Sequence, residues 1–298
     1  MTQPVFRFAP TPNGRLHLGH AYSALLNADL AARQGGRFLL RIEDIDVTRC
    51  RPEHEAGIAQ DLDWLGLSWE QPVRRQSEHF ADYAASAAGL RERGLLYPCF
   101  CSRQDIARAV DERERSSGTS WRRDPDGAPL YPGTCRALDP AEARARIAAG
   151  APHAWRLDID RALAAVPDAL AYEAFDLGGA RHTVPAAPER WGDPVIVRKE
   201  IPASYHLAVV HDDALQGVTH VVRGQDLEVA TDLHVLLQRL LGLISPLYHH
   251  HGLIVDEAGG KLAKSRASQA LADLRARGVM PAQIRERLGF PPHPTPRI

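Results

Sequence analysis

The opening of the chain breaks a strand directly into a helix, and this break constrains the fold more than any other feature. The segment PVFRFAP has the character of a strand, and Pro10, Pro12 and Gly14 then stop regular structure. From residue 17 to residue 33 apolar residues recur with helical spacing and share one face: Leu18, Ala21, Tyr22 and Leu25. A strand, a tight turn and an amphipathic helix in this order predict the first unit of an α/β fold.

The same rhythm continues along the chain. RFLLRIED at 37–44 predicts a second strand that ends in carboxylates, and helices are predicted at 52–65 and 79–93. The rhythm resumes later in DPVIVR, SYHLAVVHDD and THVVRG, and a leucine-rich helix at 228–241 is closed by a glycine. Strands that alternate with helices predict a parallel sheet with crossover helices.

The chain between Cys99 and residue 190 has a different texture. It carries three of the four cysteines, a stretch rich in alanine and proline, and the polar run DERERSSGTSWRRDPDGAP at 111–129, which is typical of a surface loop. We therefore predict an α/β domain that is interrupted by an inserted subdomain and then completed. The expected parts are the first half of the domain at 1–98, the insertion at 99–190 and the second half at 191–298.

The composition limits the partners and the compartment. Lys and Arg number 36 and Asp and Glu 37, a formal net charge of -1, so a nucleic acid would have to be met by a local basic patch. The chain does not start with a basic segment followed by an apolar one, and no apolar run is of spanning length. We expect a cytoplasmic protein without membrane contact. Four cysteines are too few for a disulfide framework and suggest a metal.

The turn after the first strand has the features of a phosphate site. A helix that begins there presents free backbone N–H groups and the positive end of its dipole to an anion. His17 and His20 can donate hydrogen bonds to phosphate oxygens, and Gly19 lets a nucleotide approach the backbone. Two alternatives stay open from the residues alone. They are an ordinary capped helix with one solvated and one core histidine, and half of a zinc site.

A second candidate phosphate-binding element lies near the end of the sequence. In GGKLAKS, residues 259–265, Lys261 and Lys264 follow two glycines and can neutralise charge that develops during phosphoryl or nucleotidyl transfer. A charged run of this kind is also typical of a solvated loop. Its combination with the histidine turn, at the front of the same α/β domain, favours a nucleotide site.

Together these motifs resemble those of the class I aminoacyl-tRNA synthetases. HLGH matches their HIGH motif, and KLAKS matches KMSKS with Leu262 and Ala263 in place of methionine and serine. Within this class, RFAPTPNGRLHLGH followed by RIEDID resembles the glutamate-specific branch, and the likeness covers most of the chain outside residues 100–190. The resemblance implies a Rossmann-type catalytic domain with an inserted zinc-containing subdomain. The implied reaction joins the glutamate α-carboxylate to the α-phosphate of ATP.

The resemblance also implies roles for individual residues. ATP, with Mg²⁺ on its pyrophosphate oxygens, would be bound by His17, Gly19, His20, Lys261, Lys264 and Ser265. His17, His20 and Lys264 of this set would be catalytic. L-glutamate would be bound by Arg7, Phe8, Ala9, Pro10, Thr11, Glu43, Tyr205 and Arg223. Glu43 would take the α-ammonium and the two arginines the carboxylates, since a planar guanidinium suits bidentate binding. Which arginine takes which carboxylate stays open.

The cysteines supply three of the four ligands that a structural zinc ion requires. Cys99 and Cys101 flank one residue, so in an extended chain their side chains point the same way, and Cys135 follows later. The candidates for the fourth ligand are, by residue type, Cys50 and His153 and, by the resemblance, Tyr131. The alternative is a set of buried free thiols.

Only residues 266–298 follow the lysine motif, fewer than the roughly 40 that an independent domain usually needs. We therefore expect no anticodon-binding domain. The resemblance then narrows to a shortened branch that attaches glutamate to queuosine at the wobble position of tRNA(Asp), where the insertion would meet the anticodon stem-loop and a monomer would suffice. Three alternatives stay open: aminoacylation of a tRNA 3′ end, another nucleotidyltransferase of the HxGH type, and a non-catalytic RNA-binding module.

Overall fold

A large parallel sheet organises the molecule. The computed structural model describes residues 3–254 and 269–291, and within them seven strands pair in the order β3-β2-β1-β9-β10-β6-β7. These strands are β1 (Val5–Phe8), β2 (Arg37–Ile42), β3 (Glu70–Arg75), β6 (Ala171–Phe175), β7 (Arg181–Pro185), β9 (His220–Gly224) and β10 (Leu247–His251). Neighbours are parallel except β6 and β7, which form an antiparallel hairpin at one edge. The predicted α/β fold class is confirmed.

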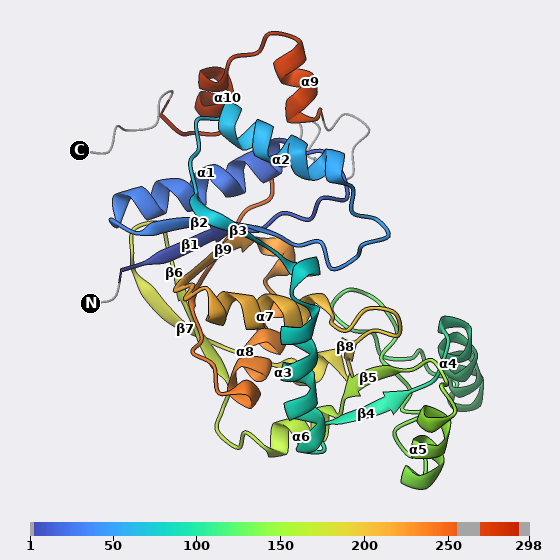
Figure 1. Cartoon of the computed structure of the whole chain (residues 1–298). Coiled ribbons are helices and arrows are strands. Elements are labelled where there is room, and N and C mark those ends of the chain that lie inside the picture. The colour runs from blue at the N-terminus through green and yellow to red at the C-terminus, as the bar shows by residue number, and fades with distance from the viewer. Residues whose placement is uncertain (1–2, 255–268, 292–298) are drawn as a thin grey trace.

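Helices cover both faces of this sheet (Figure 1). The helices of the described residues are α1 (Leu18–Arg33), α2 (Pro52–Trp64), α3 (Phe80–Glu92), α4 (Arg103–Ser117), α5 (Pro140–Ala148), α6 (Ile159–Ala164), α7 (Tyr205–Leu215), α8 (Ala230–Leu241), α9 (Leu271–Ala276) and α10 (Pro281–Arg287). One core joins α1, α2, α9 and α10 to the strands, and a second joins α3, α7 and α8. None of these helices is both long and apolar enough to cross a membrane.

The predicted elements of the α/β part are confirmed within a few residues. The helices predicted at 17–33 and 228–241 are α1 and α8, and those predicted at 52–65 and 79–93 are α2 and α3. Gly242 ends α8 with a φ of 69°, a left-handed conformation that costs glycine nothing because it has no Cβ. These helices could be predicted because each of them packs apolar side chains into one of the two cores.

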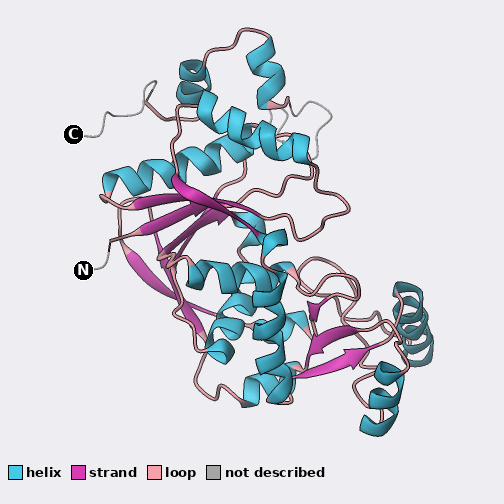
Figure 2. Cartoon of the chain, in the orientation of Figure 1, coloured by secondary structure: helices cyan, strands magenta, loops and turns pink. Residues whose placement is uncertain are grey.

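A smaller sheet builds a separate lobe (Figure 2). Its strands β4 (Leu96–Cys99), β5 (Ala154–Leu157) and β8 (Val195–Val197) are antiparallel in the order β4-β5-β8. Helices α4 and α5 lie at its outer end, which Figure 1 shows at the opposite end of the molecule from α9 and α10. In the chain, β4 and β5 of this lobe lie between β3 and β6 of the large sheet, and β8 lies between β7 and β9.

Sheet membership differs from the predicted division at residues 99 and 190. Strands β6 and β7 lie inside the predicted insertion but belong to the large sheet, whereas β8 lies outside it and belongs to the small one. The hairpin strands AYEAF and RHTVP are short and stand in sequence rich in alanine and proline. This weakens the residue pattern from which a strand is predicted. We propose to bound the inserted lobe at residues 96 and 197 and to return the β6–β7 hairpin to the large sheet.

The polar run at 111–129 is not a loop throughout, because α4 continues as far as Ser117. The Ser102 hydroxyl accepts a hydrogen bond from the Asp105 N–H at 3.1 Å, and the Asp105 carboxylate accepts one from the Ser102 N–H at 2.9 Å. This capping box supports a helix whose one buried residue is Val110. Residues 111–117 contain no apolar side chain and therefore no apolar periodicity from which a helix could be predicted, so the prediction of a loop was wrong for them.

The segment before α9 returns to the start of α1. The Leu271 N–H donates to the Leu16 carbonyl at 2.8 Å, and Ala270 forms an isolated antiparallel bridge with His17. Leu271 is fully buried in the core beneath α1 and α2. The buried Arg285 side chain, on α10, donates to the Leu65 carbonyl at the end of α2. The last helices of the described chain are therefore fixed to its first ones.

We predict that Leu271→Ala lowers the free energy of unfolding by about 2 to 5 kcal/mol, because it removes buried methyl groups and leaves a cavity. Urea denaturation followed by circular dichroism measures this loss. The control is Leu177→Ala, at a leucine that is 50% exposed, for which a change within about 0.5 kcal/mol is expected. Equal effects of the two substitutions would contradict the docked position of α9.

Candidate functional site

A cavity of about 490 Å³ lies at the carboxyl ends of β1, β2, β9 and β10. The chain leaves β1 toward β2 on one side and β9 toward β10 on the other, so the direction of winding reverses between β1 and β9. Open α/β sheets bind ligands at such a reversal, because the connections on its two sides diverge and leave a crevice. This is the position expected for the functional site of the fold.

The cavity gathers every residue predicted to bind glutamate or ATP that falls within the described part of the chain. They are Arg7, Phe8, Ala9, Pro10, Thr11, His17, Gly19, His20, Glu43, Tyr205 and Arg223. The remaining three, Lys261, Lys264 and Ser265, lie outside the described residues. The described residues nearest to that segment on each side do meet here, because Ile254 lines the cavity and Ala270 bridges His17.

The two histidines of the turn are locked into one geometry. His17 is the N-cap of α1, and its Nδ1 accepts a hydrogen bond from the Gly19 N–H at 3.1 Å, while His20 Nδ1 accepts one from the His17 N–H at 3.2 Å. The rings lie 3.8 Å apart between centroids. Burial lowers the pKa of His17, and burial with the neighbouring His17 lowers that of His20 to about 3. Both imidazoles are therefore neutral, with their proton on Nε2 and free to donate.

Gly19 packs closely against the side chain of His17. A Cβ at position 19 would lie 3.0 Å from Cε1 of the His17 ring, which is closer than nine in ten such contacts, so the ring would have to shift by a few tenths of an ångström. The capping histidine therefore folds over the glycine that follows it. The motif HLGH thus contains its own packing constraint, in addition to the close backbone approach that the sequence predicts.

A buried charge network supports the floor of the cavity. Arg7 donates to Asp213 through Nε and Nη2 at 3.0 and 3.3 Å, and Arg41 donates to the same carboxylate at 2.7 Å and to Glu43 at 3.0 Å. Burial raises the pKa of Glu43 despite the pull of Arg41. Burial opposes ionisation of Asp213 too, but Arg7 and Arg41 outweigh it and lower its pKa. Arg7 thus already has a carboxylate partner.

Arg223 differs from Arg7 because its charge has no carboxylate partner among the described residues. It is 5% exposed and contacts neutral groups only. These contacts are Thr231 Oγ1 at 2.8 Å, His234 Nδ1 at 3.2 Å, His250 Nε2 at 3.4 Å and the Tyr205 hydroxyl at 3.5 Å. A buried, uncompensated guanidinium is costly, and an anionic ligand in the cavity would offset that cost.

Sequence reasoning did not find the residues that hold these groups. Asp213 and Arg41 support Arg7 and Glu43, while Thr231, His234 and His250 surround Arg223. The polar ending of HLAVVHDD, and a histidine inside the leucine stripe of α8, are the only signals in the sequence. Both are typical of ordinary helices, so only the folded arrangement gives them a role.

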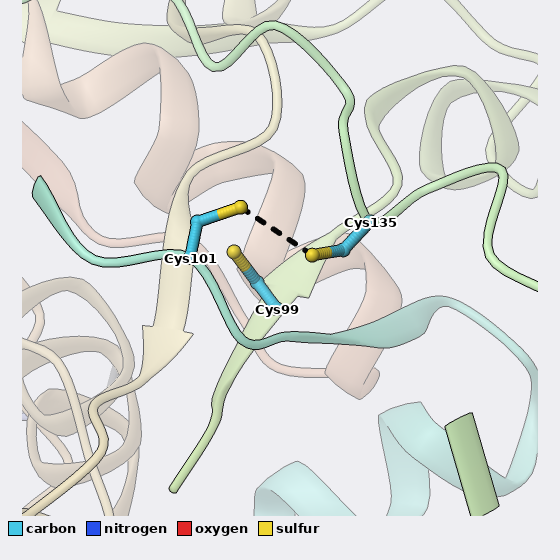
Figure 3. Close-up of side chains that lie close together, drawn as sticks. All are labelled: Cys99, Cys101 and Cys135. Atoms are coloured by element: carbon cyan, nitrogen blue, oxygen red, sulfur yellow. Dashed lines mark hydrogen bonds between the residues drawn. The ribbon is translucent and has the colours of Figure 1, made fainter. Parts of the chain in front are cut away.

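Three cysteines converge in the inserted lobe (Figure 3). The thiols of Cys99, Cys101 and Cys135 lie within 4.8 Å of one another, and no other cluster of metal-ligating residues occurs in the part of the chain that the structure describes. Cys101 Sγ and Cys135 Sγ are 3.5 Å apart. The neighbouring Cys99 thiol lowers the pKa of Cys135 to about 6, which favours the thiolate that a metal requires.

Tyr131 is the predicted fourth ligand that lies beside this triad. Its hydroxyl is 3.4 Å from Cys101 Sγ and accepts a hydrogen bond from the Cys135 N–H at 2.8 Å. The Arg156 guanidinium lies 3.9 Å from the centre of its ring, a charge that favours a tyrosinate, whereas burial and the hydrogen bonds to the cysteine thiols raise the pKa of Tyr131 and oppose it. Cys50 and His153 are not members of the cluster. The donor set of three sulfurs and one oxygen fits a tetrahedral zinc ion.

The cavity of about 490 Å³ at the ends of the strands can therefore bind two kinds of group at once. Its β1–α1 side offers the start of a helix and two neutral histidine donors, which suit phosphate oxygens. Its other side offers the buried Arg223 for a carboxylate and the Glu43 carboxylate for an ammonium group. An amino acid and a nucleotide could lie side by side here, as the resemblance implies.

Comparisons with known proteins agree with this arrangement. The family described as "tRNA synthetases class I (E and Q), catalytic domain" matches residues 4–295. A "Glutamyl-Q tRNA(Asp) synthetase" of Rhodobacter capsulatus is 47% identical over 96% of this chain and 100% of its own length. A protein of the same description from Symbiobacterium thermophilum is 40% identical over 95% of this chain and 85% of its own length.

A solved structure extends the likeness to three dimensions. The crystal structure of a glutamate tRNA ligase from Elizabethkingia meningosepticum, in complex with its amino acid, superposes with a TM-score of 0.71 at 25% identity. The match covers 93% of this chain and 53% of the ligase, so this chain spans about half of that protein. The described sheet and lobe thus have a counterpart in a protein that holds an amino acid.

We predict that Cys135→Ser releases zinc, because it removes a thiolate from a set that has no spare ligand beside it. Inductively coupled plasma mass spectrometry on the purified variant should find far less zinc than in the wild-type protein. Cys50→Ser is the matched control, since Cys50 lies outside the cluster, and it should keep its zinc. Undiminished zinc in the Cys135 variant would contradict the assignment.

We predict that the protein loses stability as the pH falls below about 6.5, because several histidines are held neutral in the fold. Burial lowers the pKa of His220 and His206 to about 4 and that of His250 to about 3, and it lowers the pKa of His234 as well. The unfolded chain binds these protons near pH 6.5 and the folded chain does not, so each group costs at most about 1.4 kcal/mol per pH unit.

Urea denaturation at pH 7.0 and pH 5.5 measures this dependence. The variant His234→Gln cannot take up the proton and should lose less stability between the two pH values than the wild-type protein. Equal slopes for both proteins would show that His234 is not held neutral by the fold.

Proposed function

This chain belongs to the class I tRNA synthetases of the glutamate and glutamine type, and from that membership we propose that it activates L-glutamate with ATP and transfers the glutamyl group to queuosine in tRNA(Asp). Membership makes it an enzyme of the ligase type. The choice of queuosine in tRNA(Asp) is supported by the names of its relatives and by the resemblance of its motifs. The zinc ion is proposed as a structural part of the inserted lobe.

The observation that carries the glutamate assignment is the uncompensated Arg223 in a cavity shared with the histidine turn. Glutamate brings an ammonium group and two carboxylates. We propose that Arg223 binds one carboxylate, that Glu43 binds the ammonium group, and that Arg7 adds a second positive charge from its place on Asp213. Tyr205 and Thr11 add hydroxyl groups, and the backbone of Phe8, Ala9 and Pro10 forms the wall.

The chemistry asked of the protein is positioning and charge stabilisation. The α-carboxylate oxygen of glutamate attacks the α-phosphorus of ATP, the bond to the bridging oxygen breaks, and glutamyl-adenylate and pyrophosphate result. The Nε2–H groups of His17 and His20 donate to phosphate oxygens, and Gly19 leaves room beside them. Mg²⁺ would neutralise the pyrophosphate oxygens, and we propose that Lys261, Lys264 and Ser265 bind the phosphates, with Lys264 acting in catalysis.

The acceptor would approach from the inserted lobe. A cavity of about 690 Å³ lies between the lobe and α7, and a third cavity of about 220 Å³ shares lining residues with both it and the glutamate cavity. All three are lined by Tyr205. The largest is also lined by four arginines and three aspartates, which are Arg49, Arg103, Arg156, Arg198, Asp124, Asp126 and Asp193. The arginines suit the phosphates of the anticodon stem-loop of tRNA(Asp). We also propose that the active protein is a monomer and that it acts in the cytoplasm.

We predict ATP-dependent transfer of radiolabelled glutamate to tRNA(Asp) that contains queuosine, and no transfer to the same tRNA that lacks it. Acid precipitation of the tRNA measures the product. Arg223→Gln is the control for the site, because it removes the uncompensated charge and should abolish both transfer and glutamate-dependent pyrophosphate exchange. Equal labelling of the two tRNA preparations would overturn the queuosine assignment.

The second candidate is aminoacylation of a tRNA 3′ end. It is favoured by the fold shared with the glutamate tRNA ligase of Elizabethkingia meningosepticum. Labelling of tRNA(Glu) in the same assay, with a product that periodate treatment of the 3′ end prevents, would select it. Absence of any glutamate-dependent pyrophosphate exchange, with or without tRNA, would instead indicate a non-catalytic RNA-binding module.

A further inference from the structure

A chain of hydrogen bonds leads from Arg223 out of the glutamate cavity, and the inference drawn from it rests on the proposed role of that arginine. Arg223 Nη1 lies 3.2 Å from His234 Nδ1, and His234 Nε2 lies 3.1 Å from His206 Nδ1. His234 is 2% exposed, in the middle of α8, whereas His206 lies on α7 and lines the cavity beside the inserted lobe. The chain therefore links the two cavities.

The direction of each hydrogen bond follows from the first one. A guanidinium can only donate, so His234 Nδ1 must accept and carries no proton. Burial, reinforced by the positive charge of Arg223, keeps His234 neutral, so its proton is on Nε2 and is donated to His206. His206 Nδ1 then accepts, which leaves its own proton on Nε2. One tautomer of each ring satisfies the whole chain.

The other side of the guanidinium is held in the same way. Arg223 Nη2 donates to Thr231 Oγ1 at 2.8 Å, and Nε donates to His250 Nε2 at 3.4 Å. Thr231 and His234 stand three residues apart on α8 and thus face the same direction. The arginine is fixed by neutral acceptors on both sides, none of which competes with an anionic substrate for its charge.

We propose that His234 is a positioning residue for amino-acid binding: its Nδ1 orients the Arg223 guanidinium toward the substrate carboxylate, and His206 holds the His234 ring in the tautomer that makes this possible. The role concerns binding of the amino acid and does not involve ATP, because the residues proposed to bind ATP, His17 and His20, belong to another element, the start of α1, and neither takes part in the hydrogen-bond chain of Arg223. A substitution of His234 should therefore change the KM for glutamate and not the KM for ATP.

Glutamine can replace both functions of the imidazole. Its side-chain oxygen can accept from Arg223 while its amide nitrogen donates toward His206. Leucine has a similar volume and suits a buried helix position, but it can do neither. The pair His234→Gln and His234→Leu therefore separates hydrogen bonding from packing. His220→Leu is a control, since His220 is a buried histidine of β9 that stacks on Phe6 and makes no contact with Arg223.

Glutamate-dependent pyrophosphate exchange in the presence of tRNA, with glutamate and ATP varied separately, tests the proposal. His234→Leu should raise the KM for glutamate about tenfold or more, the usual effect of losing a hydrogen bond to a charged group, and leave the KM for ATP within about twofold. His234→Gln should recover most of the loss. His220→Leu should leave the KM for glutamate unchanged.

The proposal fails if His234→Leu leaves the KM for glutamate unchanged. It fails equally if the glutamine and leucine variants are impaired alike, or if the KM values for both substrates rise together. In each of these cases the wild-type protein still activates glutamate, so the proposed function stands. A wild-type protein that shows no exchange with glutamate would overturn both proposals.

Discussion

The buried carboxylate of Asp213 holds together the strands and the helix that build the candidate site. It accepts hydrogen bonds from Arg7 on β1 and from Arg41 on β2, and it is itself carried by α7, whose first residue is Tyr205. Two buried guanidinium groups near each other would repel without it. Strands β1 and β2 are thus connected to helix α7 through one negative charge.

Much of this architecture is written in local sequence patterns. The strand, turn and helix of residues 5–33 follow from periodicity, two prolines and the capping histidine, all of which act over a few residues. The same holds for α8, where a leucine stripe ends at a glycine. The members of the candidate site could be predicted because they stand in short sequence motifs, which can be recognised without the structure. The structure then brings these motifs to one cavity.

The partners of those residues could not be predicted, for a physical reason. Asp213 acts on Arg7 across 206 residues of sequence, and His234 on α8 reaches Arg223 on β9 only in the folded chain. Such contacts depend on the fold and leave no local pattern. The helix in the first part of the polar run at 111–129 could not be predicted for a different reason. Helix α4 is capped at Ser102 and carries mostly exposed charged residues, so it lacks an apolar stripe. The β6–β7 hairpin was hidden by its short strands.

The bridge between Ala270 and His17 has a consequence for substitutions at position 270. The contact is made by backbone atoms, and the adjacent bond runs from the Leu271 N–H to the Leu16 carbonyl. Main-chain pairing of this kind does not depend on the side chain at position 270. The peptide groups, and not the identity of that residue, therefore fix the start of α9 against the histidine turn, and a substitution there that keeps the extended backbone would leave this contact in place.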